Sequence, residues 1–387
     1  MGEWQETPLS TVASLRLKTV DPSLLGDQLV EHYSIPAYDS GSAEIVPASQ
    51  IQSNKFAVPD DAVLVSRMNP HIPRVWHIKS RGSHPRLCST EFVPLLPRQP
   101  YASYFLYQLC RSPKFLGSVA ELTTGTTGSH QRVERSALLC IPVPLPPLSE
   151  QRAIAEVLGA LDDKIEANRR VAERVEHLAI DVSATMIATR TVGSVAEVHR
   201  DLVSTAAFAS QVVEHFSLPA FDSSRLPCVE NGDVIKSGKF LLDGPTVLVS
   251  KLNPRIPRVW MAVPTGGCSA VTSTEFVGLV PTTDYPVEVL WVLCASAKFS
   301  SQLAEMARGT TGSHQRVSVD DVLSLKVPDP EMLGKDIMEI IAAAVGLAGT
   351  LRKESLHLAS LRDALLPKLL SGELRVRDAE SLVEEAV

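Results

Sequence analysis

The sequence predicts an α+β protein built from two similar domains, each followed by one long helix. Three observations support this fold class: a long internal repeat, short apolar runs bounded by proline and glycine, and two stretches with heptad spacing. The chain has 387 residues. That is too long for one ordinary core and suits two domains with connecting helices.

The repeat extends over most of the chain. Nearly identical segments recur at an offset of 184 residues, and an earlier segment recurs at an offset of 183, so one inserted residue separates the two registers. The paired segments are Glu31–Asp39 with Glu214–Asp222, Val65–Trp76 with Val249–Trp260, Ser89–Phe92 with Ser273–Phe276, and Gly125–Val133 with Gly309–Val317. Two copies of one domain follow from this pattern.

Within each copy, short runs predict strands and one longer run predicts a helix. In the first copy the strands are expected at Ala62–Ser66, Arg74–Ile78 and Glu91–Leu96, because these runs are apolar or alternating. Tyr101–Leu122 has leucines and phenylalanine at helical spacing and is expected to form one helix. We expect Phe115 in the core, with Phe299 as its counterpart, and Lys114 and Lys298 merely exposed.

The first long helix is expected to begin at Ser149, which is well placed as an N-cap before Glu150 and Gln151. About 32 residues, from Ser149 to Ile180, would span about 48 Å. An alternating four-three spacing of apolar or core-like positions predicts a coiled-coil seam. Its members are Ile154, Leu158, Leu161, Ile165, Asn168, Ala172, Val175 and Ala179.

A second seam predicts a second long helix, which Pro367 and Gly372 are expected to end. We expect it to pack on the first helix. The polar members Asn168 and Glu354 either fix the register of the pair or lie at a solvated edge. The second seam comprises Ile337, Ile340, Ala344, Leu347, Leu351, Glu354, Leu358, Leu361 and Leu365.

These patterns divide the chain into five consecutive segments. They are a first domain (1–148), a first long helix (149–190), a second domain (191–330), a second long helix (331–375) and a tail (376–387).

Composition limits the classes of protein that remain. With 44% hydrophobic and 21% charged residues the chain is expected to fold. None of the six cysteines forms a C-x-x-C pair, which argues against a zinc ribbon or a disulfide scaffold and predicts free thiols. The sequence shows no apolar leader and no span of membrane length, so we expect a cytoplasmic protein without membrane contact.

The net charge of −7 argues, taken alone, against a nucleic-acid partner. However, residues 62–90 and 244–274 contain no acidic residue, so we expect two local positive faces. Their basic residues are Arg67, Arg74, Lys79, Arg81 and Arg86 in the first copy and Lys251, Arg255 and Arg258 in the second.

The order of domain, helix, similar domain and helix resembles the specificity subunits of type I restriction-modification systems. Local marks of that family are Pro144–Arg152 running into Leu161–Glu166, Leu365–Leu374 near the end, and the Gly-Thr-Thr-Gly loop in each copy. The second helix departs from the pattern, because Pro328–Leu333 lacks the Ser-Glu-Gln signature.

The resemblance implies two target-recognition domains separated by two antiparallel coiled-coil helices with pseudo-two-fold symmetry. It also implies a subunit without catalytic activity that binds double-stranded DNA and two DNA methyltransferase subunits, and through them restriction subunits. No cofactor is expected in this chain, whereas S-adenosylmethionine, ATP and Mg are implied for the partner subunits.

The segment Asn-Pro-x-Ile-Pro-Arg-Val-Trp is a candidate DNA-binding loop, because its two prolines make it rigid. Arginine or lysine can pair with guanine, and asparagine with adenine, in the major groove. The structural alternative is a turn capped by asparagine, with the Val-Trp pair entering a core strand. The candidate contacts are Arg67, Asn69, Arg74, Lys79 and Arg81 in the first copy and Lys251, Asn253, Arg255 and Arg258 in the second.

The loop Gly-Thr-Thr-Gly-Ser-His-Gln-Arg offers backbone N–H groups, hydroxyls and a cation, a set suited to phosphate oxygens. The alternative is a connection with no contact to DNA, since glycine-rich loops are common. The histidines have no neighbouring ligands in sequence, so we expect no metal site. The loop candidates are Thr126, Thr127, His130 and Arg132, and Thr310, Thr311, His314 and Arg316.

The sequence also bears on two other functions, those of an adenine methyltransferase and of a stand-alone DNA-binding or scaffolding protein. Asn69–Ile72 only faintly resembles the Asn-Pro-Pro-aromatic motif of adenine methyltransferases, and no glycine-rich cofactor loop follows a strand, so we do not expect a methyltransferase. A stand-alone DNA-binding or scaffolding protein would have the same domains but no methyltransferase partner. Co-purification with a methyltransferase discriminates between these possibilities.

The repeat predicts that the two DNA half-sites are similar and inverted, with a spacer set by helix length. They should not be identical, because His77–Cys88 has become Met261–Thr272 with the loss of three positive charges.

Overall fold

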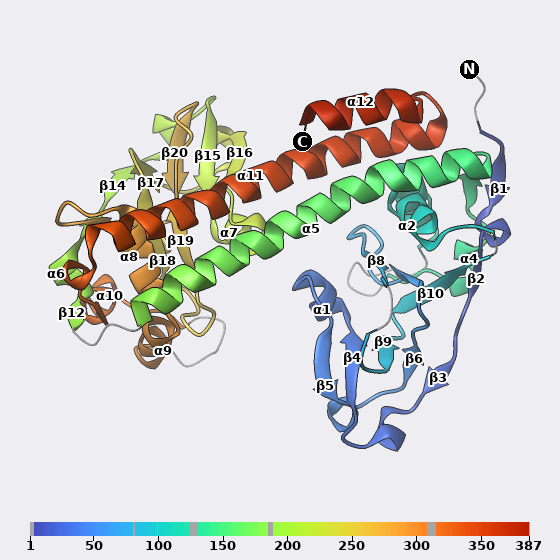
Figure 1. The fold of residues 1–387 in the computed structure, drawn as a ribbon, viewed down its shortest axis with the longest axis horizontal. Helices are drawn as coiled ribbons and strands as arrows, with labels where there is room; N and C mark the ends of the chain where they lie inside the picture. Colours follow the sequence, from blue (N-terminus) through green and yellow to red (C-terminus); the bar gives the residue numbers. More distant parts are fainter. Residues whose placement is uncertain are drawn as a thin grey trace. The chain divides into compact units, whose positions relative to one another are not determined.

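The computed structural model describes residues 4–79, 82–98, 100–123, 131–184, 189–307 and 315–386 (Figure 1). The chain divides into two compact units. Unit 1 comprises Met1–Asp163 and Leu358–Val387, and unit 2 comprises Lys164–His357. Each unit therefore contains one copy of the repeat and a part of each of two long helices, α5 (Leu148–Ala184) and α11 (Lys335–Ser371).

Unit 1 contains one five-stranded, one four-stranded and one two-stranded sheet among its described residues. Its strands are β1 (Glu6–Pro8), β2 (Ala13–Leu15), β3 (Thr19–Val20), β4 (Leu29–Tyr33), β5 (Glu44–Pro47), β6 (Lys55–Ala57), β7 (Val63–Ser66), β8 (Val75–His77), β9 (Arg86–Cys88), β10 (Phe92–Pro97) and β11 (Pro142–Pro144). The strand orders are β3-β6-β9-β4-β5, β2-β10-β7-β8 and β1-β11. Strands β4 and β9 run parallel. The short helices are α1 (Ile35–Asp39), α2 (Ser103–Arg111), α3 (Pro113–Glu121) and α4 (Arg135–Leu138).

Unit 2 repeats this topology strand for strand. Its strands are β12 (Thr189–Thr191), β13 (Ala196–His199), β14 (Asp201–Val203), β15 (Val212–Phe216), β16 (Cys228–Asn231), β17 (Lys239–Leu242), β18 (Thr246–Ser250), β19 (Val259–Ala262), β20 (Ser269–Thr272), β21 (Phe276–Pro281) and β22 (Lys326–Pro328). Their orders are β14-β17-β20-β15-β16, β13-β21-β18-β19 and β12-β22. The parallel pair is again present, between β15 and β20. The short helices are α6 (Val192–Val195), α7 (Leu218–Ser224), α8 (Val287–Cys294), α9 (Ala297–Glu305) and α10 (Val319–Ser324).

The three strands predicted in the first copy are confirmed as β7, β8 and β10. The single helix predicted over Tyr101–Leu122 was wrong, because the segment forms α2 and α3. The break lies at Ser112, which has extended backbone and caps α3 through a hydrogen bond from the Phe115 N–H. Pro113 explains the break, since proline suits the first turn of a helix and disfavours a helical residue before it.

Each unit has an aromatic cluster around the tryptophan of the repeated segment. Trp76 packs edge-on against Tyr33 and Tyr38, with ring centroids 4.8 and 5.4 Å apart. Trp260 packs edge-on against Phe221 and at a tilt against Phe216. Both tryptophans therefore belong to the core, which is the structural alternative considered for Trp76. Phe115 and Phe299 are also buried, as predicted, and all six cysteines are free.

The predicted seam of α5 is confirmed. Its members are buried or half-buried along the helix, from Ile154 to Ala179. The helix begins at Leu148, one residue before the predicted start, and it ends at Ala184. Residues 189 and 190, expected in this helix, lie instead in β12.

The predicted seam of α11 was wrong in its first half. Ile340 is 66% exposed, whereas Ile341, Val345 and Ala348 are buried. The observed seam continues in the same four-three spacing through Arg352, Ser355, Ala359 and Arg362 to Leu366 and Leu369. The two arginines can occupy seam positions because acidic residues on α5 neutralise their charge. The predicted seam followed apolar residues and therefore fell on the neighbouring face of the helix.

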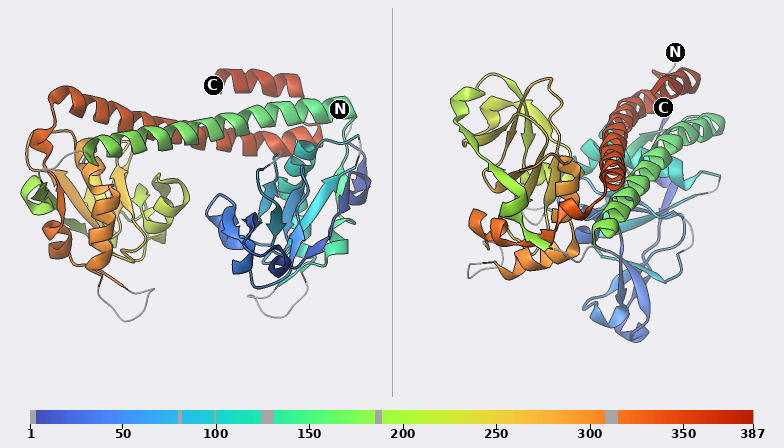
Figure 2. Two further views of the ribbon diagram at one scale, coloured as in Figure 1. Left: turned by 60° about the horizontal axis from the view of Figure 1, so that its bottom comes forward. Right: turned by 60° about the vertical axis from the view of Figure 1, so that its left-hand side comes forward.

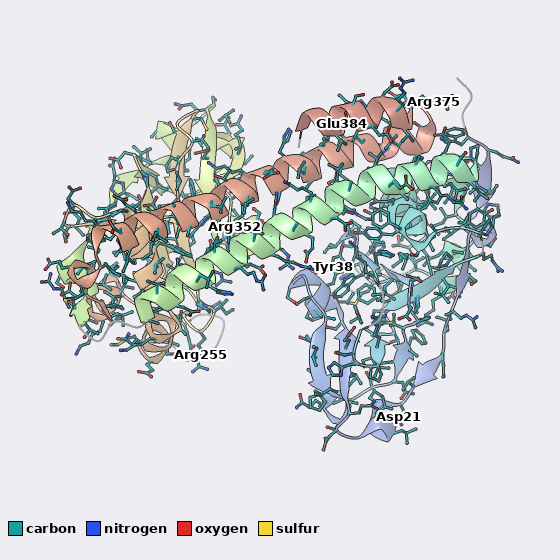
Figure 3. The ribbon with its side chains drawn as sticks, viewed as in Figure 1. Asp21, Tyr38, Arg255, Arg352, Arg375 and Glu384 are labelled. Carbon is teal, nitrogen blue, oxygen red and sulfur yellow. The ribbon has the colours of Figure 1, made fainter. Side chains whose placement is uncertain are left out.

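Those two arginines form the main polar contacts between α5 and α11, one in each unit. In unit 1, Arg362 binds Asp162. In unit 2, Arg352 binds both carboxylate oxygens of Glu176, with Nη2–Oε2 at 2.6 Å (Figure 3). The helices run antiparallel, because the start of α5 packs with the end of α11 in unit 1 and the reverse holds in unit 2. Both views of Figure 2 show the two helices side by side within each unit.

The two predicted polar seam residues behave differently. Asn168 is buried, and its Nδ2 has no hydrogen-bond partner among the described residues. Glu354 forms an ion pair with Lys164 at 3.2 Å. At the end of α11, Pro367 lies inside the helix, contrary to the prediction, whereas Gly372 follows its last residue with a φ of 77°. The expected tail forms a further helix, α12 (Val376–Ala386).

Candidate nucleic-acid interface

The repeated Asn-Pro-x-Ile segment forms the same tight turn in both units. Asn69 and Asn253 have left-handed backbone, with φ of 48° and 50°. The Ile72 N–H donates to the Asn69 carbonyl at 2.8 Å, and Ile256 repeats this bond to Asn253. Asparagine tolerates left-handed backbone better than most residues, so these asparagines first serve the turn.

The turn lies next to the residues that end the Gly-Thr-Thr-Gly-Ser-His-Gln-Arg segment, Gln131 and Arg132 in unit 1 and Gln315 and Arg316 in unit 2. The Asn69 N–H donates to the Gln131 carbonyl at 3.0 Å, and the Asn253 N–H donates to the Gln315 carbonyl at 2.9 Å. Isolated β-bridges join Met68 to Arg132 and Leu252 to Arg316. Two motifs about 60 residues apart in sequence therefore form one surface in each unit, which we call the turn-and-loop surface (residues 67–74 with 131–133, and 251–258 with 315–317).

Most candidate residues of the Gly-Thr-Thr-Gly loop lie in parts of the chain that the structure does not describe. Thr126, Thr127, His130, Thr310, Thr311 and His314 lie outside the described residues, so their predicted phosphate contacts stay predictions. The two arginines that end the loops are described. Arg132 pairs with Glu91 and Arg316 pairs with Glu275, each at 3.0 Å, and both arginine side chains are about half exposed.

The arginines of the Pro-Arg-Val-Trp segment are held inside each unit. Arg74 binds both oxygens of Asp39 at 2.7 and 2.9 Å, and Arg258 binds both oxygens of Asp222 at 2.6 and 2.8 Å. Each arginine side chain is only 11% exposed. The aspartate engages Nε and Nη2 of each arginine, so these ion pairs hold the backbone under the turn, and the predicted DNA contacts of Arg74 and Arg258 stay predictions.

One basic residue precedes the turn in each unit, Arg67 in unit 1 and Lys251 in unit 2. The Arg67 Nε donates to the Val133 carbonyl at 3.0 Å, and burial lowers the pKa of Arg67. Its counterpart Lys251 is half-buried, and the Val317 N–H donates to its carbonyl. The Val133 N–H likewise donates to the Arg67 carbonyl at 3.0 Å, so both units share the backbone connection and Arg67 adds a side-chain hydrogen bond to it.

The positive face predicted over residues 62–90 is largely neutralised by acids from other segments. Lys79 pairs with Asp163 of α5 at 2.8 Å. Arg86 is buried between Glu31 and Asp60, at 3.0 and 2.7 Å. Arg81 lies outside the described residues. A segment without acids is therefore not an acid-free surface, because packing brings acids to it.

Sequence reasoning named Arg255 at the exposed tip of the second turn but missed His71, Ile72 and Ile256. His71 and Ile72 are exposed in unit 1, and Arg255 and Ile256 are exposed in unit 2. Ile72 is 47% exposed and Ile256 is 51% exposed, although isoleucine usually lies inside. The available signal was the pair of prolines on either side, which keeps these two residues at the outside of a rigid turn. Figure 3 shows Arg255 at the periphery of unit 2.

Within the described residues, no group of three histidine, cysteine or acidic side chains is arranged to hold a metal ion. None of the described helices is long and apolar enough to cross a membrane.

The left-handed turn gives a direct stability prediction. Replacing Asn253 by alanine should lower the free energy of unfolding by about 1 kcal/mol, because the short polar side chain of asparagine supports left-handed backbone by local hydrogen bonding and the methyl group of alanine does not. Replacing it by glycine should leave that free energy nearly unchanged, since glycine adopts this conformation readily. Urea denaturation of the two variants measures the difference, and equal stability of both would contradict the turn role.

The chain is similar to DNA specificity subunits of type I restriction enzymes. A family model described as the type I restriction modification DNA specificity domain matches residues 1–177. The MjaIX specificity subunit of a type I restriction enzyme from Methanocaldococcus jannaschii is 20% identical over 331 residues, which cover 77% of this chain and 75% of that protein. The MjaVIII specificity subunit from the same organism is 39% identical over 72 residues, and that match spans 19% of this chain and only 16% of the relative.

A solved structure has the same fold. The S subunit of a type I restriction-modification system from M. genitalium aligns with a TM-score of 0.54 and 15% identity, covering 95% of this chain and 96% of that chain. At this identity the likeness concerns the fold alone.

Proposed function

We propose that this chain is a specificity subunit of a type I restriction-modification system, and that each of its two units reads one half of a bipartite DNA target. The observation that carries the proposal is the duplicated turn-and-loop surface, in which a rigid turn lies beside the residues that end a glycine-rich segment in each unit. Base contacts from the turn would give specificity, and phosphate contacts from the loop would fix orientation.

In this proposal the contacts come from the exposed part of the predicted set. Arg255, Lys251, Arg132 and Arg316 have exposed or half-exposed side chains beside the turn or the loop. The threonines and histidines of the loop are proposed phosphate contacts by their chemistry. Asn69, Arg74, Asn253 and Arg258 would act by shaping the turn.

We propose that the chain carries out no chemistry itself and directs methyltransferase subunits, and through them restriction subunits, to the target. S-adenosylmethionine, ATP and Mg would be bound by those partners. The negative net charge supports a partner requirement, because the chain alone has little general attraction for DNA.

The apolar side chains left outside the helix seams support a protein partner. Ile340, Leu347 and Leu356 on α11 and Leu178 on α5 are exposed in unit 2. A cavity of about 420 Å³ in the same unit is walled by apolar and aromatic side chains, and Leu356 is among them. Exposed apolar surface of this kind is typical of protein interaction sites.

Sequencing of DNA methylation tests the proposal. A strain that carries this chain with its methyltransferase should methylate one bipartite motif, and deletion of the gene for this chain should abolish methylation of that motif. An unchanged methylation pattern after deletion would contradict the proposal. A methyltransferase that does not co-purify with the chain would favour a stand-alone DNA-binding protein instead.

A further inference from the structure

Of the positive charges lost in the second copy, the one at Arg86 is internal, whereas Lys79 is exposed and pairs with Asp163 of α5. In unit 1, Glu31 binds Arg86. In unit 2 the equivalent Glu214 is buried and accepts hydrogen bonds from the Thr265 N–H at 2.9 Å and the Thr265 hydroxyl at 2.6 Å. The glutamate carboxylate therefore has Arg86 as its partner in unit 1 and Thr265 in unit 2. This change lies inside the domain and does not alter its outer surface.

The exposed tips of the two turns differ at a single position. Residues 70–73 read Pro-His-Ile-Pro and residues 254–257 read Pro-Arg-Ile-Pro, so His71 corresponds to Arg255. Both side chains are exposed. In the described parts of the chain, neither side chain has a hydrogen bond or an ion pair.

The two tips are held by the same internal contacts. Below each tip an arginine is clamped by an aspartate, Arg74 by Asp39 and Arg258 by Asp222. On the other side the asparagine N–H donates to a glutamine carbonyl, that of Gln131 in unit 1 and of Gln315 in unit 2. A side chain on such a support can meet a base with little loss of conformational freedom.

We propose that this position makes the two DNA half-sites different: Arg255 reads a guanine in the second half-site, and His71 does not impose the same requirement on the first. Arginine presents a planar fork that can donate to N7 and O6 of guanine together, whereas neutral histidine has one donor and one acceptor and cannot form that fork. Ile72 and Ile256 offer the same apolar contact to a neighbouring base in both halves. The inference rests on the proposed function.

Two reciprocal substitutions test it, His71→Arg and Arg255→His, in the full chain expressed with its methyltransferase. The readout is the methylated motif. Arg255→His should lower the preference for guanine at one position of the second half-site about tenfold or more, with the other positions unchanged. His71→Arg should add a guanine requirement at the equivalent position of the first half-site.

A third variant, Arg255→Lys, separates the fork from the charge. It should retain overall methylation but lose base preference, because lysine is a point charge without the planar fork. Arg174→His, an exposed arginine on α5 in unit 2, is the matched control and should leave the motif unchanged.

Three results would overturn the inference. The first is a parent motif retained by both reciprocal variants. The second is a uniform loss of methylation at all sites without a change of motif, which would mean that Arg255 contacts phosphate. The third is a parent chain that directs methylation to no bipartite motif, which would also refute the proposed function, whereas the first two results leave that function intact.

Discussion

Replacement of Arg352 by alanine should lower the free energy of unfolding of unit 2 by about 3 kcal/mol, the low end of the range for breaking a buried ion pair. Arg352 binds both oxygens of Glu176, whose side chain is only 7% exposed. Removal of the arginine leaves a buried carboxylate with one remaining cation, Arg225, at 3.5 Å. Because Arg225 still partly neutralises Glu176, we expect a loss of stability at the low end of the range for a broken buried ion pair.

Native-state hydrogen exchange of α11 amides in unit 2 measures this free energy. Lys353→Ala is the matched control, because Lys353 is exposed and next to Arg352, and it should change the free energy by less than about 0.5 kcal/mol. The double variant Glu176→Leu with Arg352→Met should recover most of the loss, since apolar residues can replace a buried pair. Equal effects of Arg352→Ala and Lys353→Ala would contradict this account of the helix seam.

Unit 1 should lose stability in mild acid because of one histidine. His77 stacks on Tyr107 and contacts the Ser103 hydroxyl at 3.1 Å, and its Nδ1 has no partner among the described residues. Burial, assisted by the nearby positive charge of Lys79, lowers the pKa of His77 to about 4, although Asp61 and Asp162 act in the opposite direction. The folded unit therefore holds His77 neutral.

The direction of the pH dependence of stability follows from which state of the chain binds the proton of His77. Between pH 6.5, the ordinary pKa, and pH 4 the unfolded chain protonates this histidine and the folded chain does not, so stability falls as pH falls through this window. A pKa lowered by about 2.5 corresponds to a loss of about 3 kcal/mol by pH 4.

His77→Met introduces the residue found at the equivalent position of unit 2, Met261, and removes the titrating group. Urea denaturation at pH 7 and pH 4 should show a smaller loss of stability in the variant than in the parent, by about 3 kcal/mol. Parallel pH profiles for the two proteins would contradict the proposed burial of neutral His77.

The repeat made much of the fold predictable. Because Val65–Trp76 recurs as Val249–Trp260, the same strands and the same turn were expected twice, and both units have them. The strands were found because buried β-residues are apolar in short runs. The break at Ser112 was missed because apolar spacing continues on both sides of Pro113, although the proline itself was a signal.

The errors share a physical cause, which is pairing between charges that are distant in sequence. The seam of α11 was misplaced because Arg352 and Arg362 are buried against acids of α5. The pairing of Arg74 with Asp39, 35 residues earlier, was also not foreseen, and the predicted DNA contact of Arg74 stays a prediction. A basic residue looks free to bind DNA when its acidic partner is distant in sequence. Sequence patterns do not show which acidic residue folding brings next to it.

The methylated motif of a duplicated-domain chain tests the central claim most directly. In this chain, residues 191–330 are replaced by residues 1–148, so that both units carry the first copy of the repeat. If each unit reads its own half-site, the complex should methylate a target made of the first half twice, while the parent chain methylates its original bipartite motif. A duplicated-domain chain that still assembles with the methyltransferase and keeps the parent motif would contradict the claim.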